Sequence, residues 1–298
     1  MLKLTFALTA ALLCQTAQAQ TGNAATVGAT TKSTKYGNNK AAGATFIHDG
    51  VKLYYETYGE GEPLLIIHGN GSSIGEMRAQ IDHFRKRFHV IAMDSRDHGK
   101  SADSPDALNY EKMTDDQAAL LDHLKIPSAN VLGWSDGGIE ALLLALRHPT
   151  KVKKLAVMAA NLYPAGATPE ALAWVKSAID SASPAERATP AGKRDIKVSS
   201  MMLVEPHIDP KSLEAITPPT LVLASDHDVV KDEHTLEIYH HLPNSQLCIF
   251  PNATHMIPYD DPPLFNSTVE RFLRAPFVKK DRIQDFLKSI EAIKKSEK

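Results

Sequence analysis

The chain has 298 residues, of which 43% are hydrophobic and 23% are charged, so it can bury a large core. Its formal net charge of −2 gives no sign of a polyanionic partner. Basic residues are also not interleaved with aromatic ones, as they often are on surfaces that bind nucleic acids. We therefore expect no nucleic-acid partner.

The first residues have the pattern of an export signal. Lys3 precedes an apolar stretch from Leu4 to Leu13, and Ala17-Gln18-Ala19 supplies the small residues that a signal peptidase reads. We expect residues 1–19 to be a signal peptide cleaved after Ala19. The mature protein would then be periplasmic or secreted, without stable membrane insertion.

Two cysteines bear on the processing and the redox chemistry of the chain. Lipid attachment through Cys14 is not favoured, because the bulky Leu13 precedes it where a small residue is wanted. Once the signal is removed, Cys248 alone is left, so no intramolecular disulfide can form. Residues 20–43 are rich in small and polar residues without apolar periodicity, and we expect a flexible leader there.

Apolar runs alternate with helical patterns over residues 44–275. The predicted strands are Phe46 to Glu56 and the runs that end at Ile67, Met93, Leu132, Ala159, Ala224 and Phe250. Tyr54 and Tyr58, near Gly59 to Glu62, suggest an opening antiparallel hairpin. Together these patterns predict an α/β domain with a mostly parallel, doubly wound sheet of about eight strands and helices on both faces.

A glycine-rich loop follows the predicted strand Pro63 to Ile67. Its sequence is His68-Gly69-Asn70-Gly71, and glycine permits tight main chain at such a turn. In acyl transfer the developing oxyanion needs N–H donors, each worth about two to three orders of magnitude in rate. We expect the backbone N–H groups of Asn70 and Asp136 to form this oxyanion hole. The other interpretation is a simple turn after a strand, and the two are compatible.

The stretch Gly133-Trp134-Ser135-Asp136-Gly137 lies between a predicted strand and a helical pattern. A sharp turn between these elements strains its central residue, and small flanking residues let neighbouring main chain pass. Ser135 would then project its hydroxyl beside the start of a helix, where unpaired N–H groups favour negative charge. These features predict a serine nucleophile, with Trp134 near the substrate.

The pattern changes between residues 161 and 218, where two helices are expected, at Pro169 to Ile179 and at Lys193 to Val204. Ser183-Pro184 and Thr189-Pro190 are expected to break the chain between them. Such an insertion can form a short helical cap that excludes water from a site. Its apolar side chains either line a substrate pocket or pack beneath the cap: Trp174, Met201, Met202 and Leu203.

A serine nucleophile needs a base and an acid that orients the base. The buried strand Pro219 to Ala224 leads into a loop that contains Asp226, His227 and Asp228. We predict Asp228 as the acid, because it stands further from the strand than its rival Asp226. The same cluster could suggest a metal site, but no second ligand cluster has suitable spacing, so we expect no metal.

His255 follows the last predicted strand, Gln246 to Phe250, and its position makes it the predicted base among the chain's 13 histidines. Beyond the helix expected at Leu264 to Leu273, an apolar stripe appears in residues 276–298. Its members are Ile283, Leu287, Ile290 and Ile293. We expect an additional amphipathic helix docked on the body, with a dimer contact or a membrane-surface contact as the alternatives.

The order Ser135, Asp228, His255 resembles that of the α/β-hydrolase superfamily. Two further segments carry the resemblance, which spans about residues 44 to 275. His68 to Gly71 is similar to the family's H-G-x-x oxyanion loop, and residues 94–101 are similar to its D-x-R-G-x-G-x-S segment, with Asp97 where glycine is usual. The resemblance implies one domain with a cap insertion, a serine hydrolase activity on a small molecule, and no cofactor.

The elbow Gly-Trp-Ser-Asp-Gly-Gly and the segment Ala160 to Tyr163 resemble valacyclovir hydrolase-like enzymes, which cleave α-amino acid esters. That resemblance implies that Asp136 holds a substrate ammonium group, for which a carboxylate supplies a charge-assisted hydrogen bond. The other interpretation is that Asp136 is only an early-helix acidic residue. Trp134 and Trp174 are further candidate substrate contacts.

The predicted function is therefore an exported serine hydrolase that cleaves a carboxylic ester through an acyl-enzyme. Lactones, amides and cleavable C–C bonds use the same machinery, and the sequence does not separate them. A non-catalytic binding protein of the same fold is the alternative from a different class. The sequence does not determine the oligomeric state.

Overall fold

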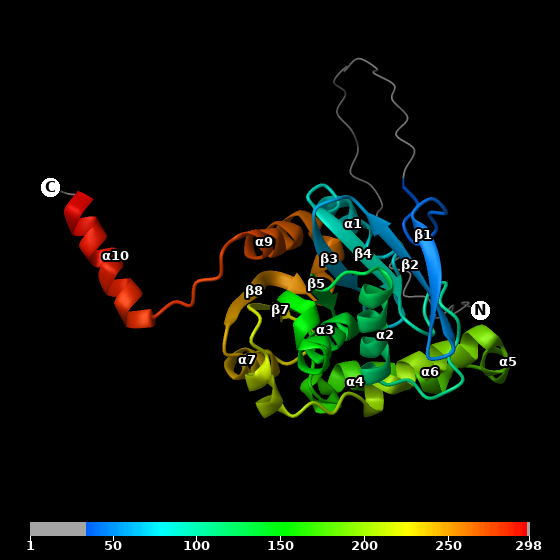
Figure 1. The fold of residues 1–298 in the computed structure, drawn as a ribbon. Helices are drawn as coiled ribbons and strands as arrows, with labels where there is room; N and C mark the ends of the chain where they lie inside the picture. Colours follow the sequence, from blue (N-terminus) through cyan, green and yellow to red (C-terminus); the bar gives the residue numbers. More distant parts are fainter. Residues whose placement is uncertain (1–33, 297–298) are drawn as a thin grey trace, which may run out of the picture.

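Eight strands form one sheet in the computed structural model, which describes residues 34–296 (Figure 1). The strands are β1 (Gly43–His48), β2 (Val51–Tyr58), β3 (Glu62–Ile67), β4 (Phe88–Asp94), β5 (Ala129–Trp134), β6 (Val152–Met158), β7 (Thr220–His227) and β8 (Ser245–Thr254). Their order is β1-β2-β4-β3-β5-β6-β7-β8. β2 pairs antiparallel with β1 and with β4, and the other neighbouring pairs are parallel. The predicted mostly parallel α/β sheet is confirmed.

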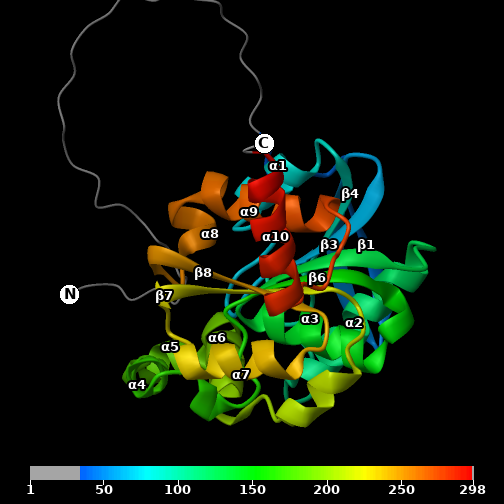
Figure 2. The same ribbon diagram turned by 90° about the vertical axis from the view of Figure 1, so that its left-hand side faces the viewer.

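Helices cover both faces of this sheet (Figures 1 and 2). One face carries α1 (Arg78–Phe84), α8 (Ile257–Asp260) and α9 (Pro262–Arg274), and the other carries α2 (Tyr110–His123), α3 (Asp136–Arg147) and α7 (Asp232–His241). β3 shows why both faces are covered. Leu64 and Ile66 pack in the core under α1, α8 and α9, while Leu65 and Ile67 pack in the core under α2, α3 and α7. Side chains alternate along a strand, so a strand buried on both faces is apolar throughout.

The opening hairpin lies at a different place from the one predicted. Asp49 and Gly50 form the two-residue turn between β1 and β2, with φ of 47° and 72°. Such turns suit Asp-Gly, because both central residues take positive φ. At Gly59 to Glu62, where the hairpin was predicted, the chain instead enters β3, which pairs with β4 and β5.

Part of the predicted leader is ordered against the body. The Glu56 carboxylate is buried and accepts hydrogen bonds from the backbone N–H groups of Gly37 and Asn39, both at 2.8 Å. The Tyr36 hydroxyl donates to Asp82 on α1 at 2.9 Å. The prediction of a flexible leader was wrong for residues 34–42, because a buried carboxylate on β2 requires these donors. The predicted signal peptide, residues 1–19, lies outside the described residues.

A helical cap is inserted between β6 and β7, within the predicted range 161–218. It contains α4 (Pro169–Ser181), α5 (Pro184–Ala188) and α6 (Pro190–Val204), with short 3₁₀ turns at Pro164–Gly166 and Pro210–Ala215; another 3₁₀ turn, Pro149–Lys151, precedes β6. Each cap helix starts with proline after a capping hydroxyl, from Thr168, Ser183 or Thr189. The predicted chain breaks at Ser183-Pro184 and Thr189-Pro190 are therefore helix starts.

The last helix, α10 (Arg282–Ser296), stands away from the body at the end of an extended segment (Figure 1). None of its side chains is buried, and Ile283, Phe286 and Ile293 are more than half exposed. The helix was predicted correctly, but its docking on the body was not. None of the helices between residues 34 and 296 is long and apolar enough to cross a bilayer.

Candidate active site

Ser135 occupies a strained turn between β5 and α3. Its backbone has φ 57° and ψ −121°, a conformation that non-glycine residues rarely adopt. A Cβ on Gly133 would lie 2.0 Å from the Gly137 carbonyl oxygen, and one on Gly137 would lie 2.2 Å from the Ile67 carbonyl oxygen. Only glycine fits at these two positions, as the sequence pattern indicated. The turn presents the Ser135 hydroxyl at the carboxyl edge of the sheet.

The structure brings the three predicted triad residues together. His255 Nε2 lies 3.0 Å from Ser135 Oγ, and His255 Nδ1 lies 2.7 Å from Asp228 Oδ1. The Asp228 side chain is fully buried, and its carboxylate also accepts from the backbone N–H groups of Ser225 and Val230. These bonds hold the carboxylate in place. A proton on Nδ1 of His255 then leaves Nε2 free to accept the serine proton.

Asp226, the rival acid, does not reach His255. Its exposed carboxylate accepts from the backbone N–H groups of Asn252 and Ala253, at 2.7 and 2.9 Å, and so ties the end of β7 to β8. These two bonds lower the pKa of the Asp226 carboxyl. Within the described residues, no group of three or more His, Cys, Asp or Glu side chains could hold a metal ion.

Asn70 and Asp136, whose backbone N–H groups are the predicted oxyanion donors, lie on the loop after β3 and at the first residue of α3. Within the described part of the chain, neither N–H donates to a protein acceptor. Gly71, next to Asn70, has a φ of 63°, and its N–H donates to His98 Nε2 at 3.1 Å. The loop is therefore fixed, while the two predicted donors are available.

The Asp136 side chain is buried beside the nucleophile. Asn70 Nδ2 donates to Asp136 Oδ2 at 2.8 Å, and the buried Tyr110 hydroxyl interacts with the same carboxyl. Burial raises the pKa of Asp136 to about 6, and the hydrogen bonds from Asn70 and Tyr110 oppose that shift. A carboxyl group that is mostly ionised at pH 7 therefore lies close to Ser135.

A cavity of about 390 Å³ opens above Ser135, His255 and Asp136. Most of its wall is apolar and comes from the cap and from the loop after β7. Among the lining residues, all of which lie in the described chain, Asp136 and Glu205 are the carboxylates, and none is Lys or Arg. Desolvation is the main reason that the pKa of Glu205 is raised. Sequence reasoning missed Glu205 and Tyr110, because only tertiary structure brings them to the site.

Only some of the predicted aromatic and cap residues line the cavity. Trp134 and Trp174 both line the cavity, with Trp134 buried and Trp174 61% exposed at the cap. Trp134 Nε1 also donates to the His255 carbonyl at 3.0 Å, so this side chain supports the base's loop. Met202 lines the cavity, Met201 packs in the core beneath the cap, and Leu203 is not among the lining residues.

Two neutral histidines join the oxyanion loop to the loop after β4. His68 Nε2 accepts from the Ser95 N–H at 3.0 Å, and the two imidazole rings of His68 and His98 lie 5.1 Å apart. Burial lowers the pKa of His68 to about 4 and that of His98 to about 3. Both rings are therefore uncharged at neutral pH and act as acceptors for backbone N–H groups.

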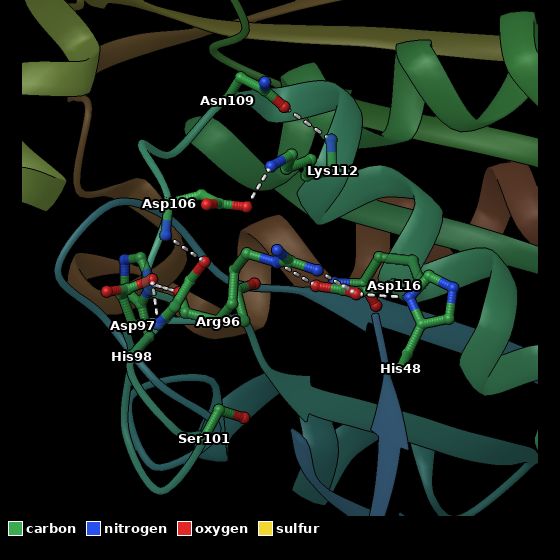
Figure 3. Close-up of polar contacts among 12 residues, drawn as sticks. His48, Arg96, Asp97, His98, Ser101, Asp106, Asn109, Lys112 and Asp116 are labelled. Atoms are coloured by element: carbon green, nitrogen blue, oxygen red, sulfur yellow. Dashed lines mark hydrogen bonds and ion pairs between the residues drawn. The ribbon is translucent and has the colours of Figure 1, made fainter. Parts of the chain in front are cut away.

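A buried ion pair anchors the same loop to α2 (Figure 3). Arg96 donates to both Asp116 oxygens, from Nε at 2.7 Å and from an Nη at 2.8 Å, and His48 Nδ1 lies 2.7 Å from Asp116 Oδ1. The bidentate geometry fixes the direction of the Arg96 side chain. This cluster therefore fixes the loop after β4 to α2, and none of its three side chains is part of the triad.

Comparisons of sequence and structure relate the chain to known hydrolases. Residues 62–182 match the family model for the alpha/beta hydrolase fold. The chain is 36% identical to the human (Homo sapiens) serine hydrolase BPHL over 122 residues, 39% of this chain and 42% of that protein. It is 30% identical to the mouse (Mus musculus) sn-1-specific diacylglycerol lipase ABHD11 over 221 residues, 62% of this chain and 71% of that protein.

A solved structure of a hydrolase from Pseudomonas aeruginosa PA01 superposes with a TM-score of 0.67 and 25% identity, and the match covers 80% of this chain and 100% of that one. The matched segment of BPHL is less than half of that protein's length, whereas the matches to ABHD11 and to the Pseudomonas structure extend over most of those proteins. On these matches and on its fold, the chain belongs to the α/β-hydrolase family.

Proposed function

We propose that the protein is a serine hydrolase that cleaves a carboxylic ester. The observation that carries this proposal is the continuous chain of contacts from Ser135 Oγ through His255 to the buried Asp228. His255 Nε2 takes the hydroxyl proton as Ser135 Oγ attacks the carbonyl carbon, and it then gives that proton to the leaving alcohol. A water molecule, deprotonated by the same nitrogen, hydrolyses the acyl-enzyme.

The oxyanion of each tetrahedral intermediate would be bound by the N–H groups of Asn70 and Asp136. Two features support this role: both donors lack a protein acceptor within the described residues, and the second stands at the N-terminus of α3. Fixed N–H donors cost no reorganisation when the charge develops, so they stabilise the transition state more than the substrate.

An ester that carries an amino group next to its carbonyl is the proposed substrate class. Asp136 and Glu205 give the cavity two carboxylates, and no Lys or Arg lies among its lining residues. A substrate ammonium group would find a charge-assisted partner there, whereas an anionic substrate would be repelled. The cavity volume of about 390 Å³ suits a small ester.

The test compares wild-type protein with Ser135→Ala, using p-nitrophenyl acetate and a fluorophosphonate probe. We expect wild type to hydrolyse the ester and to take up the probe, and Ser135→Ala to do neither while keeping its circular dichroism spectrum. Ser225→Ala is the matched control: Ser225 is buried near Asp228, but its hydroxyl donates to the Thr254 carbonyl. The control should keep both activities.

A folded wild type that neither turns over nor labels would contradict the proposal and favour a non-catalytic binding protein. Export through residues 1–19 is also part of the proposal. Mass spectrometry of the protein recovered from the periplasm or the medium should find Gln20 at its amino terminus. An uncleaved amino terminus on protein retained in the cytoplasm would contradict export.

A further inference from the structure

The cap helix α6 is tied to the loop after β4 by an ion pair. Lys197 Nζ lies 2.8 Å from Asp97 Oδ1 and also donates to the Ser104 carbonyl at 2.6 Å. The Asp97 side chain is only 1% exposed, so this carboxylate is paired away from water. A buried carboxylate without its partner is costly, which makes Lys197 the natural complement of Asp97.

Asp97 is held in an uncommon backbone conformation. Its φ is 60°, which glycine adopts freely and aspartate adopts at some cost. Its second oxygen accepts from the Ser104 N–H at 3.1 Å. The next residue, His98, accepts from the Gly71 N–H beside Asn70. One dipeptide therefore holds the cap on one side and the oxyanion loop on the other.

The residue after Lys197 completes the connection. The Val198 carbonyl on α6 accepts from Asn70 Nδ2 at 3.1 Å, and the same amide donates to Asp136 Oδ2 at 2.8 Å. Asn70 thus uses both amide hydrogens to join the cap to the nucleophile turn. Its backbone N–H is one of the two proposed oxyanion donors, so the position of this donor depends on where α6 lies.

We infer that Asp97 and Lys197 are positioning residues, which hold α6 so that Val198 fixes Asn70 for oxyanion binding. This inference rests on the proposed hydrolase function. A role in positioning differs from a role in shaping the cavity. If the pair positions the donor, its loss lowers kcat and leaves KM nearly unchanged, because the donor acts on the transition state rather than on substrate binding.

The experiment measures p-nitrophenyl acetate hydrolysis by Lys197→Met and by Asp97→Asn/Lys197→Met. The double variant removes both charges, so it avoids an unpaired buried carboxylate where the single variant folds poorly. We expect kcat to fall about tenfold with KM within about twofold, since complete loss of an oxyanion donor costs about 10²–10³. Lys197→Arg keeps the cation and should restore most of the rate. Lys193→Met, an exposed lysine on the same helix, is the matched control and should match wild type.

The route through Asn70 is tested by Asn70→Ala, which keeps the backbone N–H but removes the two hydrogen bonds that the side-chain amide donates, to Asp136 and to the Val198 carbonyl. If Lys197 acts through this side chain, the kcat losses of Asn70→Ala and Lys197→Met will not multiply in the combined variant. Multiplicative losses, or a Lys197→Met variant with wild-type kcat, would overturn the inference. An inactive wild type would instead count against the proposed function.

Amide hydrogen exchange provides a readout that needs no activity. In Lys197→Met we expect faster exchange both in α6 and in residues 69–72, on the two sides of the Asn70 contact, relative to Lys193→Met. Faster exchange confined to α6 would show that the cap is loosened without any effect on the oxyanion loop. That result would refute the coupling, whatever the enzyme's substrate.

Discussion

Replacing Asp136 by asparagine tests how the cavity recognises a substrate amino group. The substitution removes the charge but keeps the size of the side chain, the contact with Asn70 and the backbone N–H of residue 136. Because burial raises the pKa of Asp136 to about 6, the wild-type carboxyl is mostly ionised at pH 7. The variant then loses the charge, and one acceptor oxygen of the side chain becomes an amide N–H donor.

The expected magnitude follows from the bond that would be lost. A hydrogen bond to a charged group contributes about 1.5–3 kcal/mol, and a tenfold change corresponds to about 1.4 kcal/mol. For Asp136→Asn we therefore expect kcat/KM for L-alanine benzyl ester to fall by about 10- to 150-fold. Benzyl propionate, which lacks only the amino group, should change by less than about threefold.

The assay runs the reaction at pH 7 and measures the released benzyl alcohol by chromatography. Asp226→Asn is the matched control, because Asp226 carries a carboxylate near the triad but outside the cavity lining. Equal losses on both esters would mean that Asp136 supports the elbow rather than the substrate. Unchanged kinetics on both would remove the amino ester from the proposal.

Further predictions concern pH and the triad. The ratio of kcat/KM for L-alanine benzyl ester to that for benzyl propionate should decline as pH falls below about 6, because Asp136 becomes protonated there. A ratio that stays level from pH 7 to 5 would contradict this. Asp228→Asn should lower kcat by about three to four orders of magnitude, and Asp226→Asn by less than threefold, in initial-rate assays. The lowered pKa of His98, about 3, means that the unfolded state binds a proton below pH 6.5 that the native state does not. Between about pH 6.5 and 3, this group therefore lowers the free energy of unfolding by about 1.4 kcal/mol for each pH unit of acidification. Urea titrations at pH 7.5 and 5 should show a smaller loss of unfolding free energy in His98→Gln than in wild type. Ser135→Gly should have a free energy of unfolding about 1 kcal/mol higher than that of Ser135→Ala, and therefore a higher Tm, because glycine adopts φ 57° with less strain; equal Tm values would contradict that.

Features encoded within a few neighbouring residues could be predicted from the sequence. The elbow around Ser135 and the loops that carry Asp228 and His255 each follow an apolar run, so the parallel sheet brings them to one edge. The choice of Asp228 over Asp226 matches the observed contact with His255. The position of the cap could also be predicted, because its sequence interrupts the alternation of strands and helices.

Features that depend on distant partners could not be predicted. Glu205 and Tyr110 reach the cavity only through the packing of α6 and α2 above and beside the elbow. Residues 34–42 look flexible by composition, and their order depends on the buried Glu56 carboxylate of β2. The apolar stripe of α10 indicated an amphipathic helix, but periodicity alone says nothing about which surface, if any, covers it.

The place of the cap between two neighbouring strands has a consequence for a nicked chain. β6 and β7 pair directly, from Leu155 with Thr220 to Met158 with Leu223, although about sixty residues separate them in sequence. A protease cut between α4 and α5 would leave Ser135 on one fragment and Asp228 with His255 on the other. Neither fragment alone would hold a complete site. Hydrolysis would report their reassembly, because the pairing of β6 with β7 is the contact through which the two fragments of such a split enzyme would associate.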